Sequence, residues 1–192
     1  MKSKQVNLRF GAVSLLIVLA AMSRLAPHPP NFSPVGGMAL FGAAYYSRRC
    51  WAFAIPILAM WVSDLALNNI VYAQYFDGFV WFYSGALFTY GAFAAVVLLG
   101  MLTLKKVRVG RVAAAALGAS VVFFLVSNFG VWLAAGMYPH TPAGLAACYA
   151  AGIPFFQNTI AGDLVYTAAM FGAFEWGARK LPQLRLQKIS PK

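Results

Sequence analysis

Three charged side chains stand within or directly beside long apolar segments, where a charge needs a specific reason. Asp64 and Asp163 interrupt apolar runs, and Arg24 follows the end of another. In hydrocarbon an ionisable side chain costs about 2.5–3.5 kcal/mol on insertion scales, so such residues pair with one another or serve a binding site. Two interpretations follow: Arg24 neutralises Asp64 or Asp163, or the charges contact a bound molecule.

Other polar side chains map to the same end of the expected helices as these charges. Small-molecule pockets have mostly apolar walls and a few convergent polar groups. The pattern therefore predicts a binding pocket that faces outward, and the alternative is that the asparagines only satisfy loop backbone. The candidate substrate-binding residues are Arg24, His28, Asn31, Asp64, Asn128, His140, Cys148, Tyr149, Asn158 and Asp163.

One pair among these candidates combines a thiol with an imidazole. Cys148 and His140 lie eight residues apart without an evident third catalytic group. A free cysteine usually packs as a small apolar residue. The sequence signatures of serine hydrolases, zinc proteases and phosphate-binding loops do not occur. We therefore expect no enzymatic activity, no catalytic residue, no metal and no cofactor, with an intramembrane enzyme based on Cys148 and His140 as a further hypothesis.

The composition indicates a membrane protein. Of 192 residues, 61% are hydrophobic and only 10% are charged, whereas soluble domains carry about 25% charged residues. The net charge of +11 would fit nucleic acid or anionic lipid as a partner. Its distribution in short clusters between apolar runs argues against nucleic acid.

The positive charges alternate along the chain. They cluster at the start, at every second connection and at the end, and only Arg24 of the fifteen falls elsewhere. The positive-inside rule produces this alternation, which predicts a multi-pass inner (cytoplasmic) membrane protein with both termini cytoplasmic. The clusters are Lys2, Lys4 and Arg9; Arg48 and Arg49; Lys105, Lys106, Arg108 and Arg111; and Arg179, Lys180, Arg185, Lys188 and Lys192.

The apolar runs predict one all-α transmembrane domain over 1–192 with about six membrane-spanning helices. Short basic tails are expected at about 1–7 and 181–192, and a long outer segment at 137–156. The four prolines of the loop at 26–34 forbid a regular helix. We expect that loop to dip to membrane level. The predicted helices cover 8–25, 35–47, 50–67, 78–104, 112–136 and 156–179.

Three smaller expectations follow from this arrangement. Cys50 and Cys148 lie on opposite sides of the membrane and should not form a disulfide. Glu175 stands one helical turn from Arg179, where an ion pair would explain it. Small residues four apart, such as Ala168 and Gly172, are expected to let helices pack closely.

Two longer motifs carry a family resemblance. The first is Arg-Leu-Ala-Pro-His-Pro-Pro-Asn-Phe-Ser-Pro at 24–34, followed by Gly-Met-Ala-Leu-Phe-Gly-Ala at 37–43. The second combines Ser-Asn-Phe-Gly-Val-Trp at 127–132 with the stretch from Cys148 to Asp163. Over about residues 8–178 the chain resembles the DUF6580-type bacterial membrane proteins. These are similar to the substrate-binding S components of energy-coupling-factor vitamin transporters in size, in their six helices and in a loop that closes over an outward pocket.

The resemblance implies transport. An S-component-like bundle would take up a small, vitamin-like micronutrient, with a cobalamin-like compound among the candidates. Asn31, Asp64, Asn128, Asn158 and Asp163 would line its pocket. Its partners would be the substrate, the lipid bilayer and a transmembrane coupling subunit with ATPases. The first helix lacks the Ala-x-x-x-Ala motif with which many S components dock. A solitary carrier is therefore also implied, with Cys148 as a candidate ligand for a cobalt-containing substrate. The alternative function is a ligand-free scaffold or assembly protein of the envelope.

Overall fold

The computed structural model describes residues 2–184, with side chains from residue 8 onward. This part of the chain is helical throughout, without a strand. Short irregular turns connect the long helices, namely a π-helical turn at Leu67–Val71 and 3₁₀ turns at Ala73–Tyr75 and Pro182–Leu184. The long helices are α1 (Lys2–Ser23), α2 (Val35–Tyr45), α3 (Arg49–Ala66), α4 (Ala86–Thr103), α5 (Val109–Ala134) and α6 (Pro142–Lys180).

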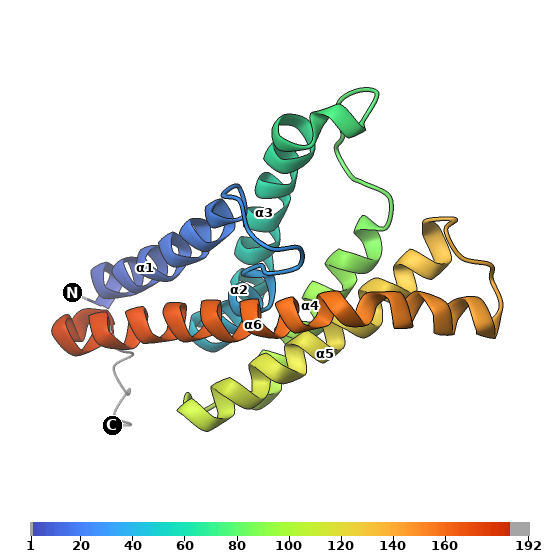
Figure 1. Ribbon diagram of the computed structural model, residues 1–192. Coiled ribbons are helices and arrows are strands. Elements are labelled where there is room, and N and C mark those ends of the chain that lie inside the picture. The colour runs from blue at the N-terminus through green and yellow to red at the C-terminus, as the bar shows by residue number, and fades with distance from the viewer. Residues whose placement is uncertain (1, 185–192) are drawn as a thin grey trace.

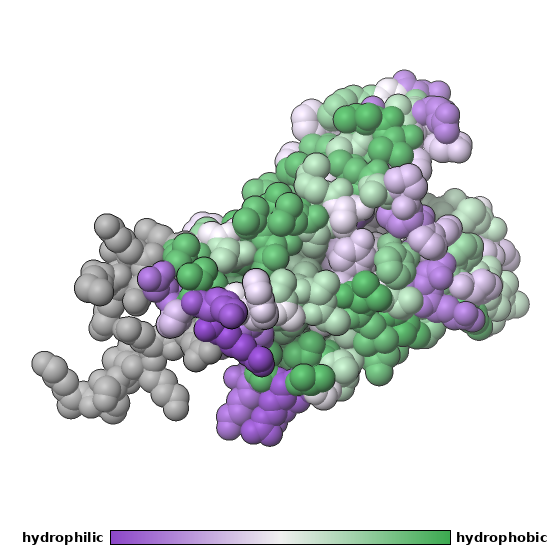
Figure 2. Space-filling model, turned by 60° about the vertical axis from the view of Figure 1, so that its left-hand side comes forward, coloured by the Kyte–Doolittle hydropathy of each residue, from purple (hydrophilic) through white to green (hydrophobic). Residues whose placement is uncertain are grey.

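Three helical segments are long and apolar enough to cross a membrane. They are Arg49–Val71, Ala86–Thr103 and Val109–Ala134, and shorter apolar helices run over Leu8–Ser23 and Val35–Tyr45. Large apolar side chains also cover the outside of the molecule. The space-filling view shows a broad hydrophobic band, with hydrophilic groups gathered toward the extremities (Figure 2). Such a surface suits lipid rather than water, so the chain is a helical membrane protein.

The helices alternate in direction, and the start of α1 and the end of α6 lie at the same end of the bundle (Figure 1). Contacts join these segments: Arg9 donates to the carbonyl oxygens of Tyr45 and Leu184, and the Tyr45 hydroxyl donates to Glu175. We call this end, which carries Arg9, Arg108 and Arg179, the basic end. The opposite end is the Arg24 end.

Helix α2 forms the centre of the bundle. Every residue from 35 to 42 is buried, and α2 contacts α1, α3, α4, α5 and α6. Glycine and alanine permit this crowding, because a Cβ at Gly100 of α4 would stand 2.7 Å from the Cβ of Ala43. Small residues therefore bring α2 and α4 together, as expected of helices packed in a membrane.

Helix α4 begins later than the sequence predicts. The expected helix started at residue 78, whereas α4 starts at Ala86. Gly85 precedes it with a φ of 85°, a left-handed conformation that glycine adopts without strain and that interrupts a right-handed helix. The expected helical start at 78–85 is therefore wrong, and these residues belong to the connection between α3 and α4.

The long outer segment expected at 137–156 is also wrong over most of its length. Helix α6 already begins at Pro142 and continues for 39 residues, with Pro154 inside it. Thr141 caps its start by accepting a hydrogen bond from the Gly144 N–H at 3.1 Å. A threonine cap followed by proline at the first helical position favours a helix start.

The predicted tails need adjustment at both ends. Helix α1 starts at Lys2, so the stretch predicted as an amino-terminal tail is mostly helical. At the other end, the turn at Pro182–Leu184 lies against α1, where Arg9 Nη1 donates to the Leu184 carbonyl oxygen at 2.9 Å. Residues 185–192 of the predicted tail, with Arg185, Lys188 and Lys192, lie outside the described residues.

Candidate functional site

The first polar cluster joins α1, α3 and α4 around Asp64. Arg24 Nη2 lies 2.6 Å from Asp64 Oδ1, and the Tyr90 hydroxyl donates to Oδ2 at 2.7 Å. Arg24 Nη1 also donates to the Ser63 hydroxyl and to the Met60 carbonyl oxygen. Of the two acidic partners that the sequence left open for Arg24, the structure selects Asp64. Both charges are largely buried and hydrogen-bonded, which a buried ion pair requires.

The second cluster joins α2, α5 and α6 around Asp163. This carboxylate is only 3% exposed. Its Oδ1 accepts the backbone N–H of Gly36 at 3.1 Å, and its Oδ2 accepts the Ser120 hydroxyl at 2.7 Å. Gly36 lies in the first turn of α2, where N–H groups have no partner within the helix. Asp163 therefore satisfies the start of α2 from a neighbouring helix.

Thr167 extends the second cluster by one helical turn. It is 2% exposed, and its hydroxyl oxygen is the one buried side-chain oxygen or nitrogen without a hydrogen-bond partner within the described part of the chain. A buried hydroxyl without a partner carries a free-energy cost. Thr167 therefore offers an unused donor and acceptor beside the Asp163 carboxylate.

The proline-rich loop, residues 26–34, lies along α6 at the Arg24 end. Asn158 Nδ2 donates to the Pro30 carbonyl oxygen at 2.9 Å, and the rings of Phe32 and Tyr166 stand 5.8 Å apart. Between them, a Cβ at Gly162 would stand 2.7 Å from the Ser33 nitrogen. The loop thus contacts one face of α6 at positions four residues apart, and it leads directly into α2, whose Gly36 binds Asp163.

Two of the predicted binding residues belong to the proline-rich loop itself. Asn31 is exposed and has a φ of 64°, a left-handed conformation that asparagine tolerates better than most residues. His28 Nδ1 lies 3.0 Å from the carbonyl oxygen of the adjacent Pro29. Both side chains therefore sit in the bend of the loop rather than against Asp64 or Asp163.

The remaining predicted residues form a third cluster between α5 and the start of α6. Cys148 Sγ donates to the Asn128 carbonyl oxygen at 3.3 Å, the Asn128 amide donates to the Phe124 carbonyl oxygen at 2.8 Å, and the Tyr149 hydroxyl donates to the Leu125 carbonyl oxygen at 2.7 Å. These bonds attach the first turns of α6 to α5.

The pairing of Cys148 with His140 is not seen in this cluster. The His140 ring instead packs edge-on against Trp132, with 5.4 Å between ring centroids. Cys50 and Cys148 are both free thiols in the structure. Across the described ranges, no group of three His, Cys, Asp or Glu side chains is placed to hold a metal ion.

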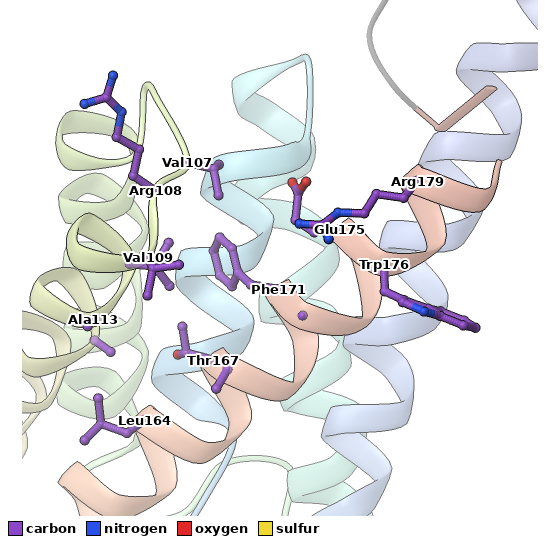
Figure 3. A pocket seen from close by; sticks show the side chains of 14 residues that line it. Val107, Arg108, Val109, Ala113, Leu164, Thr167, Phe171, Glu175, Trp176 and Arg179 are labelled. Atoms are coloured by element: carbon purple, nitrogen blue, oxygen red, sulfur yellow. The ribbon is translucent and has the colours of Figure 1, made fainter. Parts of the chain in front are cut away.

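A cavity of about 540 Å³ lies elsewhere, between α5 and α6 at the basic end (Figure 3). Ala116 and Thr167 line it, and Arg108, Glu175 and Arg179 line its polar part. None of the ten predicted binding residues lines this cavity. Sequence reasoning missed it, because small residues four apart on α6 were expected to indicate close helix packing.

Two expectations for this region are corrected by the structure. Ala168 and Gly172 line the cavity, and a Cβ at Gly172 would meet nothing within 4 Å, so this pair does not mark a tight helix contact. Glu175 accepts the Tyr45 hydroxyl at 2.6 Å. That hydrogen bond, rather than an ion pair with Arg179, is what holds the Glu175 carboxylate.

The apolar helices and the buried polar clusters define a helical membrane protein. The chain belongs to the family of unknown function DUF6580, which matches residues 4–184. The resemblance of its two motifs to this family is thereby confirmed. No curated protein and no solved structure matches the chain.

Proposed function

We propose that this protein is a membrane-embedded carrier that takes up a small micronutrient and binds it beneath the proline-rich loop. In this proposal all six helices cross the inner membrane as an S-component-like bundle, and the basic end and both termini face the cytoplasm. The clustering of Arg48, Lys105, Arg108 and Arg179 at one end supports that orientation through the positive-inside rule. The proline-rich loop would then face outward.

The observation that carries the proposal is the connection of the proline-rich loop to the Asp163 cluster. The loop contacts α6 at Asn158 and Gly162, and Asp163 is the next residue. The loop continues directly into α2, whose Gly36 N–H binds the Asp163 carboxylate. Movement of the loop away from α6 would therefore also disturb the hydrogen bond that closes the Asp163 cluster.

The chemistry of the cluster defines the kind of ligand that it would accept. Asp163 offers two acceptor oxygens, and Ser120 and Thr167 offer hydroxyl groups that donate or accept. All three are buried, so their hydrogen bonds to a ligand would form away from water and gain strength. A compact molecule with N–H or O–H donors could replace the Gly36 and Ser120 bonds to the carboxylate.

The test begins with the protein purified from cells grown in rich medium. Mass spectrometry of the extracted small molecules should find a vitamin-sized compound, and calorimetry should measure its binding to the emptied protein. Asn158→Ala removes the hydrogen bond to the loop and should speed ligand dissociation. Asn68→Ala is the matched control, since Asn68 lies in the turn after α3, away from the proline-rich loop, and is not among the predicted binding residues. No co-purified compound and no vitamin binding would refute the proposal.

A ligand-free scaffold of the envelope is the second candidate function. It is favoured by the complete pairing of both acidic residues, because Asp64 and Asp163 find their partners within the chain. A scaffold predicts that Asp64→Asn lowers stability without any effect on uptake. A carrier predicts that variants of the Asp163 cluster lower uptake at concentrations of protein matched to the wild type.

The proteins that co-purify with the carrier would reveal whether ATPases drive the transport. Helix α1 lacks the Ala-x-x-x-Ala motif, which supports a solitary carrier over one that docks a coupling subunit with ATPases. Affinity purification in a mild detergent separates these two cases. A stoichiometric membrane partner with ATPases would identify a coupled carrier, and an isolated chain that still transports in vesicles would identify a solitary one.

A further inference from the structure

The cavity at the basic end follows the divergence of two helices. Helices α5 and α6 are in close contact near their Arg24 end, where a Cβ at Gly152 would stand 2.6 Å from Asn128 Oδ1. The Ser120–Asp163 hydrogen bond joins them further along. From this hydrogen bond toward the basic end, the cavity lies between α5 and α6 and reaches Arg108 and Arg179. On α6 the lining residues run from Leu164 to Arg179, which is fifteen residues or about 22 Å along a helix.

This length matches one leaflet of a membrane with its headgroups. A bilayer is about 40–45 Å thick including the headgroups, so each leaflet contributes about 20–22 Å. The cavity therefore extends from Leu164 and Thr167 to charged residues that lie at the expected depth of the lipid headgroups. It has the dimensions of a site for one acyl chain that runs parallel to the helices.

The walls of the cavity are apolar and open toward the surroundings. Val109 is 90% exposed and Trp176 is 67% exposed, and both line the cavity. Figure 3 shows the Trp176 ring projecting from α6 below Arg179. Tryptophan at the boundary between apolar and basic residues is typical of the membrane interface. The side of the cavity that faces away from the protein is thus suited to contact with lipid.

The charged rim of the cavity, formed by Arg108, Glu175 and Arg179, carries more positive than negative charge. Within the described residues, the guanidinium groups of Arg108 and Arg179 form no side-chain hydrogen bond and no ion pair. Glu175 also lies at the rim, but its carboxylate accepts the Tyr45 hydroxyl. Guanidinium groups bind phosphate oxygens through paired N–H donors. Basic pockets between transmembrane helices on one membrane face bind the headgroups of anionic lipids.

We propose that the cavity between α5 and α6 is a binding site for an anionic phospholipid. Arg108 and Arg179 hold the phosphate group, and one acyl chain lies along Val109, Ala168 and Gly172 toward Thr167. This site borders the Asp163 cluster at Thr167 and lies apart from the proline-rich loop, none of whose residues line the cavity. It does not depend on whether the protein carries a micronutrient.

The test compares two lipids that differ in headgroup charge. The full-length protein is delipidated in detergent, titrated with dioleoyl phosphatidylglycerol or dioleoyl phosphatidylcholine, and examined by native mass spectrometry. We expect tighter binding of the phosphatidylglycerol. Arg108→Gln and Arg179→Gln should each lower its affinity about fivefold, as expected for the loss of one basic residue near a membrane surface. Arg49→Gln is the control, since Arg49 is an exposed arginine at the start of α3 outside the cavity.

A second variant tests the acyl chain rather than the headgroup. Gly172→Leu places a branched side chain into the cavity, where a Cβ meets nothing within 4 Å, and it should abolish the preference for phosphatidylglycerol. Gly11→Leu is the matched control, because Gly11 of α1 also has open space around it and lies outside the cavity. Both substitutions favour the helix, so both proteins should fold.

Any one of the following results would overturn the assignment. The first is equal binding of the two lipids. The second is an equal loss of affinity in Arg49→Gln and Arg179→Gln, which would indicate general surface charge. The third is displacement of phosphatidylglycerol by inorganic phosphate alone, or full binding by Gly172→Leu, since either would show that the acyl chain does not occupy the cavity.

Discussion

Gly36 donates its backbone N–H to the carboxylate of Asp163 across 3.1 Å, and this contact connects the start of α2 to the middle of α6. A side chain at position 36 is excluded, because a Cβ there would stand 2.6 Å from Asp163 Cγ. Glycine is therefore required for close approach of the backbone to an acidic group, rather than for an unusual backbone angle. The central helix of the bundle is thus oriented by one carboxylate.

The first prediction concerns this contact. Gly36→Ala should destabilise the protein by about 1–3 kcal/mol, the usual cost of overpacking a buried site, because the new methyl group displaces the Asp163 carboxylate. The midpoint of thermal unfolding in detergent measures the effect. Gly11→Ala is the control, since a Cβ there meets nothing within 4 Å. Equal unfolding temperatures for the two variants would contradict the role assigned to Gly36.

The second prediction concerns the buried ion pair of Arg24 with Asp64. Asp64→Asn should destabilise by about 3–5 kcal/mol, because it leaves the Arg24 guanidinium buried without its countercharge. The double variant Arg24→Gln with Asp64→Asn should lose less than the sum of the two single variants. A double-mutant cycle on unfolding free energies measures this coupling. Asp77→Asn, in the exposed connection between α3 and α4, should change stability little, and additive single effects would refute the pairing.

The sequence predicted that polar residues gather at one end of the bundle, but it did not predict that they form separate clusters around Asp64 and Asp163. The placement of Arg24 and Asp64 at the same end could be predicted, because alternating charge clusters fix the direction of each helix. The choice of Asp64 over Asp163 depends on which helix stands beside the end of α1. That neighbour relation is a property of the packed bundle, and helix order along the chain does not contain it.

The sequence around the start of α6 contains two opposing features, one that favours a helix start and one that favours a helix break. Thr141 followed by Pro142 favours a helix start, but Pro154 favours a break because it removes one backbone hydrogen bond and crowds the preceding turn. In membrane helices, neighbouring groups and local adjustment make proline tolerable. The third cluster, with Cys148 and Asn128, holds α5 against α6 on the amino-terminal side of Pro154, and the helix continues through it.

The cavity could not be predicted from residue spacing alone. Ala168 and Gly172 mark one face of α6 as small, and small residues four apart usually indicate close packing. Whether a small residue meets a neighbour or an empty space depends on the angle at which the neighbouring helix crosses. Ala43 meets Gly100 closely, whereas Gly172 meets nothing within 4 Å, and the sequence pattern is alike in both cases.

The third prediction tests whether the proline-rich loop must move. Pro30→Cys and Asn158→Cys, introduced together with Cys50→Ser and Cys148→Ala, place two thiols where the Asn158 amide now reaches the Pro30 carbonyl oxygen at 2.9 Å. A short bifunctional maleimide should then fix the loop to α6. We expect loss of substrate exchange on cross-linking, measured by release of a preloaded radiolabelled ligand.

The control for this experiment is the same protein without the cross-linker, which reports any effect of the four substitutions themselves. Unchanged exchange in fully cross-linked protein would show that the loop is a fixed part of the structure. The variant with only Cys50→Ser and Cys148→Ala also tests the enzymatic hypothesis. Full function of this variant would exclude a nucleophilic role for the Cys148 thiol.

The last prediction separates stability from binding at Thr167. Its buried hydroxyl has no partner within the described residues, so Thr167→Val should leave stability unchanged or raise it, since the cost of a buried unpaired hydroxyl disappears. Ser120→Ala should lower stability by about 1–3 kcal/mol, because it removes a hydrogen bond to the buried Asp163 carboxylate. Thr103→Val is a control, as its hydroxyl bonds within α4 to the Leu99 carbonyl oxygen at 2.7 Å.

If Thr167 contacts a ligand beneath the proline-rich loop, Thr167→Val will fold as well as the wild type and retain less ligand on purification. Equal ligand retention in a folded Thr167→Val protein would remove this residue from the binding site.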